Sequence, residues 1–213
     1  LQNHDQVGNR AIGQRTSHLL SPEQLKIGAA LVMTSPFVPM LFQGEEWAAS
    51  TPFLYFTHHQ DPELGEAVRR GRRQEFATFG WDPEEIPDPQ AEETFQRSKL
   101  NWNEPAGMLH CDVLAWVRSL IELRKQLPEL TDGRFEAIQV DWNGTAGWFT
   151  LARGTVLVAC NFSDTAQRVP CPGLADKKIV LSSAERIAAK NDAVVLPAQS
   201  VVIWAGDRKA HRW

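Results

Sequence analysis

The chain has 213 residues, of which 43% are hydrophobic and 23% charged, and its formal net charge is -4 at pH 7. This composition is typical of a folded globular protein, and the length accommodates one large domain or two small ones. Because phosphate binding needs a basic face, the acidic balance excludes nucleic acid from the expected partners.

The chain opens on "LQNHDQVGNR", which places Asn3, His4 and Asp5 before any element that could hold them. A chain start normally carries Met, followed by a polar lead-in or a targeting segment. We therefore expect further chain before Leu1. The stretch itself is interpreted as the end of a strand followed by a turn.

A helix with both ends marked comes next, in "SPEQLKIGAALVMTSP". Ser21 is the expected N-cap, Pro22 the first helical residue, and Gln24 the partner that completes a capping box. Pro36 ends the helix.

The run "FVPMLFQGEEW" then predicts a buried strand over residues 37–42 with a polar end at Gln43–Glu46. In parallel α/β folds the active site lies where such strands end. Asp5 and Glu45 are therefore expected on one face.

The stretch from Ala48 to Gly107 is a long connection rich in proline and aromatic residues, with a helix predicted over 62–76. A second helix is predicted to resume before "DVLAWVRSLIELRKQL" (residues 112–127) and to include this stretch. Its apolar face comprises Val113, Trp116, Val117, Leu120, Ile121 and Leu127.

Past residue 133 the pattern changes to short β-rich runs separated by Asn-Gly, Arg-Gly and Pro-Gly turns. Such runs predict a small antiparallel sandwich. The runs are "FEAIQV", "GWFTLAR", "TVLVACNF", "KIVLSS", "AVVLP" and "SVVIWA".

The element order, with "NHD" at the end of the first predicted strand, resembles the α-amylase superfamily (glycoside hydrolase family 13). The stretches "QNHDQVGNRAIGQR", "LFQGEEWAASTPFLYFTHHQDPEL" and "EAVRRGRRQEF" are together similar to its maltooligosyltrehalose trehalohydrolases. The resemblance implies an α/β fold joined to an all-β one. Residues 1–132 would form the C-terminal portion of a (β/α)8 TIM barrel, about strands seven and eight with their helices, and residues 133–213 an antiparallel β-sandwich.

The resemblance also assigns roles to the opening motif. Asp5 is implied to be the third acidic residue of the family's catalytic trio, and His4 a substrate-binding histidine. A fixed carboxylate that bonds ring hydroxyls gains strength as an oxocarbenium-like transition state develops charge, so Asp5 can stabilise that state. The structural alternative for Asp5 is a turn or N-cap carboxylate. The family's nucleophile and general acid are expected upstream of Leu1, so this chain alone is expected to be inactive.

Both predicted strand ends supply further candidates. Glu45 and Glu46 could bind sugar hydroxyls, or one of them could pair with Arg10 or Arg15 and brace the rim. Trp47 is either a platform for a sugar ring or a packing residue. The substrate-binding residues predicted beside His4 are Asn3, Gln6, Arg10, Glu45, Glu46 and Trp47.

No cofactor and no metal are expected. His58 and His59 lack the HExxH or HxxxH spacing that places two imidazoles on one helical face. The three cysteines show no CxxC spacing, and no apolar stretch approaches the ~20 residues of a membrane span. The sequence therefore predicts a cytoplasmic location and no membrane partner.

For the full-length protein the resemblance implies a retaining hydrolase that cleaves the α-1,4-glucosidic bond next to the terminal trehalose of maltooligosyl trehalose. The expected partners are this or a related α-glucan and the upstream half of the barrel. That half would cover apolar residues left without partners: Leu25, Leu31, Val38, Leu41, Trp116 and Leu120. Two alternatives stay open: another superfamily enzyme, such as a branching enzyme or an amylase, and a noncatalytic glucan-binding module.

Overall fold

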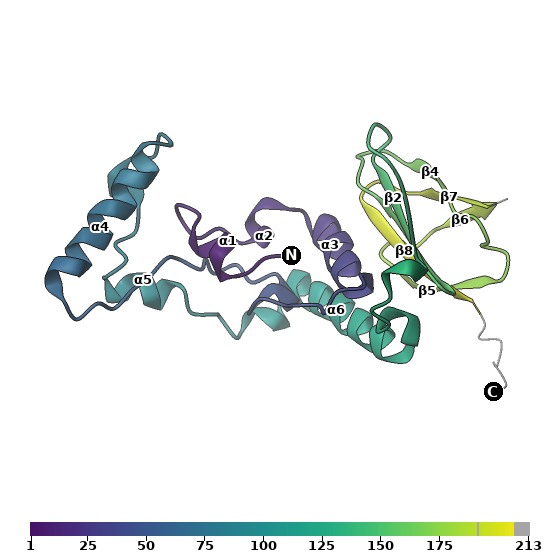
Figure 1. Cartoon of the computed structure of the whole chain (residues 1–213), viewed down its shortest axis with the longest axis horizontal. Helices are drawn as coiled ribbons and strands as arrows, with labels where there is room; N and C mark the ends of the chain where they lie inside the picture. The colour runs from purple at the N-terminus through teal and green to yellow at the C-terminus, as the bar shows by residue number, and fades with distance from the viewer. Residues whose placement is uncertain (191, 207–213) are drawn as a thin grey trace. The chain divides into compact units, whose positions relative to one another are not determined.

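A computed structural model describes residues 1–190 and 192–206 of the chain (Figure 1). The chain divides into two compact units, which are described separately below. The first unit comprises Leu1–Leu20 and Leu41–Leu114, and the second comprises Ser21–Met40 and Ala115–Trp213.

This division differs from the boundary that the sequence suggests at 132/133. It assigns helix α3 (Pro22–Thr34) and the C-terminal part of helix α6 (Met108–Gln126) to the same unit as the β-rich segment. The boundary between a barrel portion and a sandwich at 132/133 therefore stays a prediction.

The helices follow the local sequence signals closely. Ser21 caps α3, its side chain accepts a hydrogen bond from the Gln24 amide, and Pro22 occupies the first turn, as predicted. The helix expected over 62–76 is confirmed, and so is the helix expected to resume before Asp112, which begins at Met108. The described residues contain α1 (His4–Gly8), α2 (Thr16–Leu19), α3, α4 (Pro62–Ala77), α5 (Glu92–Arg97) and α6, with short 3-10 turns at Glu45–Trp47, Pro83–Glu85, Glu104–Ala106, Pro128–Leu130 and Phe135–Ala137.

The two barrel strands expected in the first 45 residues are not formed as strands. No strand precedes Ile138 in the described part of the chain. A strand is held by hydrogen bonds to a neighbouring strand, and neither segment has such a neighbour among residues 1–190 and 192–206. The segment before Asp5 leads directly into α1, and residues 37–42 are irregular.

The β-rich segment forms two antiparallel sheets, as the alternating runs predict. One sheet has the order β1-β2-β3-β8-β5 and the other β4-β7-β6. The β-rich runs predicted from the sequence do not include β4 and β6. The strands are β1 (Ile138–Asn143), β2 (Trp148–Arg153), β3 (Val156–Asn161), β4 (Gln167–Pro170), β5 (Lys177–Ser182), β6 (Ala188–Lys190), β7 (Ala193–Leu196) and β8 (Ser200–Gly206).

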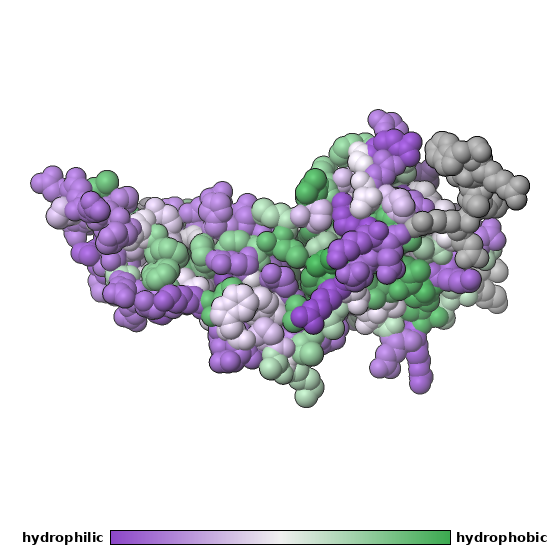
Figure 2. All heavy atoms as spheres, turned by 90° about the horizontal axis from the view of Figure 1, so that it is seen from below, coloured by the Kyte–Doolittle hydropathy of each residue, from purple (hydrophilic) through white to green (hydrophobic). Residues whose placement is uncertain are grey.

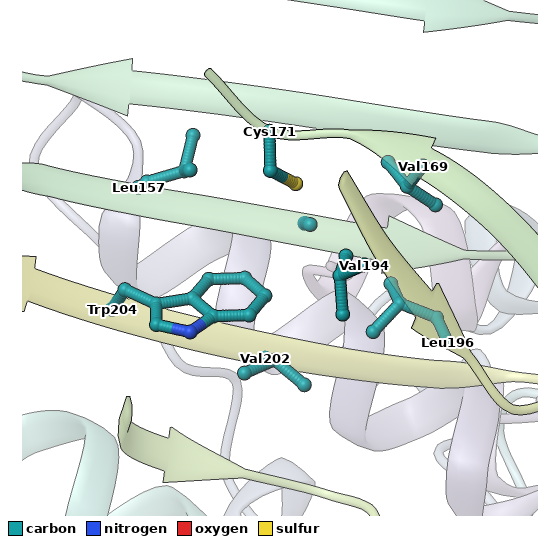
Figure 3. Close-up of a cluster of buried hydrophobic side chains, with 8 residues drawn as sticks. Leu157, Val169, Cys171, Val194, Leu196, Val202 and Trp204 are labelled. Atoms are coloured by element: carbon teal, nitrogen blue, oxygen red, sulfur yellow. The ribbon is translucent and has the colours of Figure 1, made fainter. Parts of the chain in front are cut away.

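The core of the sandwich lies between these two sheets (Figure 3). Trp204 and Val202 of β8 and Leu157 of β3 meet side chains from the smaller sheet, including Val194. Side chains of a strand alternate between faces, so Val201 and Ile203 point away from this core. They are buried all the same, because α3 packs against β8.

Two arginines of the second unit bind the carbonyl groups that end α3. Arg153 of β2 donates to the carbonyl oxygens of Thr34 (2.7 Å), Ser35 (2.8 Å) and Leu130 (3.3 Å). Arg124 of α6 donates to the carbonyl oxygens of Met33 and Ser35. The last carbonyl groups of a helix have no hydrogen-bond partners within the helix, and these guanidinium groups supply donors for them. Their positive charges also stabilise the negative, C-terminal end of the helix dipole.

The expected set of unpartnered apolar residues is only partly exposed. Trp116 and Leu120 are buried within the second unit, and the Trp116 indole donates to the Lys26 carbonyl oxygen of α3 at 2.9 Å. Val38 is 93% exposed, and its neighbours Phe37 and Met40 are also exposed. Apolar residues likewise reach the surface between hydrophilic ones on the face displayed in Figure 2.

The first unit has a smaller apolar core and relies on a buried arginine. Ala11, Phe76 and Ile86 form a compact cluster. Arg72 of α4 lies between the rings of Tyr55 and Phe76, 4.7 Å and 4.5 Å from their centroids.

Within the described residues, no helix is both long and apolar enough to cross a bilayer.

Candidate functional site

Asn3 and Gln6 cap the short helix α1. The Asn3 side chain accepts a hydrogen bond from the Gln6 amide at 3.0 Å, and the Gln6 side chain accepts one from the Asn3 amide at 2.8 Å. This reciprocal pair satisfies two backbone donors at the helix start. Both predicted substrate-binding side chains thus have a structural function in this chain.

His4 and Asp5 are free of such constraints. Their side chains are 71% and 72% exposed, and the His4 Nε2 atom lies 3.3 Å from the Asp5 Oδ1 atom. The cap is Asn3 and not Asp5, so the structural alternative for Asp5 does not apply in its N-cap form. One carboxylate and one imidazole are therefore presented together to solvent in the first turn of α1.

The loop after α1 is fixed by two arginines that bind carbonyl groups. Arg10 donates to the Gln14 carbonyl oxygen at 2.5 Å. Arg72 donates to the carbonyl oxygens of Gly8 (2.6 Å) and Arg10 (3.2 Å). Burial lowers the pKa of Arg72, although Glu75 beside it acts in the opposite direction. Arg10 is therefore part of the loop's support, and its role in substrate binding stays a prediction.

Glu45 and Glu46 follow a turn that requires glycine. Gly44 has φ = 81°, and a Cβ atom there would lie 2.6 Å from the Leu100 side chain and 2.8 Å from that of Ala49. Glu45 accepts a hydrogen bond from the Phe42 amide (3.0 Å). The Glu46 Oε2 atom is buried and accepts no hydrogen bond among the described residues.

Arg15 lies behind this turn. The sequence suggests it only as a possible ion-pair partner of Glu45 or Glu46. It is fully buried and donates to the carbonyl oxygens of Gln43 (2.7 Å) and Thr51 (2.6 Å). Burial lowers the pKa of its guanidinium group, while the nearby carboxylates of Glu104, Glu46 and Glu45 act to raise it. An arginine stays charged even so.

Trp47 is buried and does not present an open ring. Its indole packs on Trp102, with ring centroids 5.3 Å apart, and its Nε1 atom donates to Glu104 at 3.3 Å. The exposed aromatic of this pair is Trp102, which is 74% exposed. A role for Trp47 as a sugar platform stays a prediction, whereas the open ring belongs to a residue that the sequence did not single out.

Glu104 is a second residue that sequence reasoning missed. Burial acts to raise the pKa of its carboxyl group, but hydrogen bonds from the Ser50 hydroxyl, the Ser50 amide and the Trp47 indole outweigh burial and hold that pKa below its ordinary value. Nothing in "NWNEP" indicates this contact, because Glu104 reaches Ser50 across 54 positions of sequence.

The structure brings together some of the predicted residues and not others. Among the described residues, no hydrogen bond or ion pair joins Asp5 to Glu45, Glu46 or Trp47. His59 binds Gln90 through its backbone, and no group of three potential metal-ligating side chains occurs in the described ranges. The predicted site is thus two separate groups, His4 with Asp5 and the turn at Gly44–Trp47.

Comparison with known proteins identifies close relatives. Residues 133–203 match a family described as a domain of unknown function, DUF3459. The chain is 49% identical over 168 residues to a malto-oligosyltrehalose trehalohydrolase of Brevibacterium helvolum, covering 79% of this chain and 28% of that protein. It is 44% identical over 202 residues to the protein of the same name from Rhizobium sp. (strain M-11), covering 95% of this chain and 33% of that protein. The chain therefore spans no more than about a third of these relatives.

Solved structures agree with this relationship. A protein of Salmonella typhimurium, provisionally assigned as an α-amylase, superposes with a TM-score of 0.79 at 37% identity over 96% of this chain and 34% of that one. A trehalulose synthase matches with a TM-score of 0.56 at 17% identity over 86% of this chain and 38% of its own, which supports the fold alone. The fold of this chain is thus that of part of an α-amylase-type enzyme, as its sequence implied.

Proposed function

Because the chain belongs to the malto-oligosyltrehalose trehalohydrolases of the α-amylase superfamily, we propose that it forms the C-terminal part of a trehalose-releasing glycoside hydrolase. The reaction is hydrolysis, with retention, of the α-1,4-glucosidic bond next to the terminal trehalose of maltooligosyl trehalose. The observation that carries this proposal is the identity of 42–50% to curated relatives of that name over most of the chain.

In this proposal Asp5 acts on the sugar whose glycosidic bond breaks. Its carboxylate accepts hydrogen bonds from ring hydroxyls, and these bonds strengthen as the sugar becomes an oxocarbenium-like cation. His4, whose imidazole lies beside that carboxylate, donates to a further hydroxyl. The exposure of both side chains supports this role, since a ligand can reach them without displacing protein atoms.

The fixed turn at Gly44–Trp47 has a different role in this proposal. Glu45 is held by the Phe42 amide, and the Glu46 Oε2 atom is buried without a hydrogen bond among the described residues, so this turn would bind sugar hydroxyls through the other Glu46 carboxylate oxygen. No cofactor or metal takes part. The nucleophile and the general acid are supplied by a polypeptide segment outside these 213 residues, which completes the barrel.

The test is a chimera in which this chain replaces the matching segment of the Rhizobium sp. (strain M-11) relative. We expect the purified chimera to release trehalose from maltooligosyl trehalose, and the 213-residue chain alone to release none. Release of trehalose by the pure chain alone would overturn the proposed division of catalytic groups. A folded chimera that forms only branched glucan or maltooligosaccharides would instead favour a branching enzyme or an amylase.

Two further expectations belong to the same proposal. If the chimera folds and binds glucan but hydrolyses no α-glucan, the result would favour a noncatalytic glucan-binding module.

We also propose a cytoplasmic location, because Cys111, Cys160 and Cys171 are free thiols. Fractionation of cells that make the native protein would test this location.

A further inference from the structure

A pocket in the first unit has no role in the function proposed above. Its volume is about 350 Å3, and four aromatic side chains contribute to its lining: Phe53, Phe56, Phe95 and Trp102. Small-molecule sites have volumes of roughly 300–1,000 Å3 and are mostly apolar, with a few polar groups. Neither His4 nor Asp5 lines this pocket.

The aromatic wall is built as one rigid unit. The rings of Phe53 and Phe56 meet edge to face at 5.7 Å, and Phe56 meets Phe95 in the same way at 5.2 Å. The Leu54 amide donates to the hydroxyl of buried Ser98 at 3.0 Å, which joins this segment to the end of α5. Edge-to-face pairs and a buried hydrogen bond fix ring orientations before any ligand arrives.

Trp102 completes the pocket and is supported from behind. One side of its indole packs on Trp47, and the ring remains 74% exposed. Trp47 is itself held by Glu104 through its indole nitrogen, and its carbonyl oxygen lies 2.8 Å from the His110 Nδ1 atom. An exposed indole on a fixed support loses little conformational entropy when a ligand stacks on it.

The polar groups of the pocket limit what the ligand can be. Lys99 lies with its ammonium group 4.9 Å from the centre of the Phe95 ring, and Gln43 lines the same pocket. One ammonium group is too little for a phosphate-rich ligand, which calls for several donors. A pyranose ring fits better, because its C–H face stacks on an indole while its hydroxyl rim bonds Lys99 and Gln43.

We propose that this pocket binds a glucosyl unit of the α-glucan chain, with Trp102 as the stacking platform. It holds a sugar unit other than the one that contacts Asp5 and thereby favours longer chains. The proposal takes its substrate class from the function proposed above, but it concerns binding and not hydrolysis.

The test uses the 213-residue chain and maltoheptaose as the probe, with binding measured by isothermal titration calorimetry. We expect saturable binding that Trp102→Ala weakens about tenfold, the loss typical of an aromatic residue central to a binding site. The matched control is Trp142→Ala, because Trp142 on β1 is also exposed, at 66%, and lies in the other unit. This control should leave the dissociation constant unchanged.

Two further variants separate binding from folding. Lys99→Met and Gln43→Ala alter the pocket without removing the ring that packs on Trp47, and each should weaken binding severalfold. If the chain alone does not melt cooperatively, the same variants are compared in the chimera carrying Asp5→Asn. Absence of maltoheptaose binding to the folded chain, or equal effects of Trp102→Ala and Trp142→Ala, would overturn the proposal.

The outcome is separable from that of the proposed hydrolase. If the chimera binds maltoheptaose in a manner that depends on Trp102 but releases no trehalose, the binding proposal stands and the catalytic assignment is contradicted. Trehalose release with no effect of Trp102→Ala on either binding or chain-length preference retains the catalytic assignment and removes the pocket.

Discussion

The two units of the chain are stabilised in different ways. In the second unit, two sheets enclose a continuous apolar core, and the strands satisfy one another's backbone groups. In the first unit the apolar cluster is small, and buried arginines such as Arg15 and Arg72 bind backbone carbonyls beside it, as Arg153 does in the second unit. Buried polar atoms without a hydrogen-bond partner among the described residues occur in both units, on Arg15 and Glu46 in the first and on Glu129 in the second.

The comparison shows which segments find their packing and hydrogen-bond partners among the described residues. The sandwich also packs against α3, which contacts β8 and whose end is bound by Arg153. In the first unit, the segment before Asp5 resembles a barrel strand but has no neighbouring strand among the described residues, and His4 and Asp5 are presented to solvent. Groups that a folded region leaves unsatisfied are candidates for binding, whereas groups that it satisfies are structural.

The largest expected effect is in the core of the sandwich. Trp204→Ala removes a buried indole between the sheets and should lower the free energy of unfolding by about 3–5 kcal/mol. Trp142→Ala removes an exposed ring and should change it by less than about 0.5 kcal/mol. Urea unfolding of both variants measures the difference, and equal losses would show that the core is not where the stability of this unit lies.

A smaller loss is expected from the clamp on the end of α3. Arg153→Met leaves the carbonyl groups of Thr34 and Leu130 buried without their donor, at a cost of about 3 kcal/mol. Arg134→Met serves as the control, because this arginine is 75% exposed and forms a surface ion pair with Asp132. Thermal melts that place Arg153→Met within the error of the control would contradict the clamp.

The cap of α1 is expected to contribute about 1 kcal/mol, the usual value of an N-cap side chain. Asn3→Ala removes the acceptor for the Gln6 amide. Exchange of that amide proton with deuterium should therefore accelerate, while amides of β8 are unaffected. A Gln6 amide that exchanges at the same rate in both proteins would show that tertiary packing, and not the cap, holds α1.

The smallest effect concerns Glu104 and pH. Its pKa is lowered in the folded state, so its contribution to stability is present above the ordinary value of 4.5 and is lost as pH falls through the folded pKa. Wild type should thus be more stable than Glu104→Gln at pH 7, and this advantage, below about 1 kcal/mol, should narrow under more acidic conditions. A stability difference between the two proteins that does not change with pH would contradict the assignment.

Short-range sequence patterns correctly predicted the elements that depend on short-range interactions. The capping box at Ser21, the helix beginning at Pro22 and the strand runs that contain Leu157 and Trp204 follow from spacing and capping alone. Strands β4 and β6 were missed because QRVP and AAK lack the apolar run by which the equally short β7, AVVL, was recognised.

The site was predicted only where a motif carries it. His4 and Asp5 stand together in the sequence and in the structure. Glu104 and Trp102 reach Trp47 from far along the chain, and no spacing rule connects positions so distant. The expected strands at residues 37–42 and before Asp5 have no neighbouring strand among the described residues, so their local pattern alone could not decide their structure.

The assignment of Asp5 is tested most directly by the kcat of trehalose release in the chimera. Asp5→Asn keeps the shape of the side chain and removes the charge that stabilises the transition state, so kcat should fall by about a thousandfold while KM changes little. Asp176→Asn, which alters an exposed carboxylate in the second unit, should leave kcat unchanged. An Asp5→Asn chimera that keeps about half of the wild-type kcat, where loss of a transition-state contact predicts a large fall, would contradict the central role given to this carboxylate.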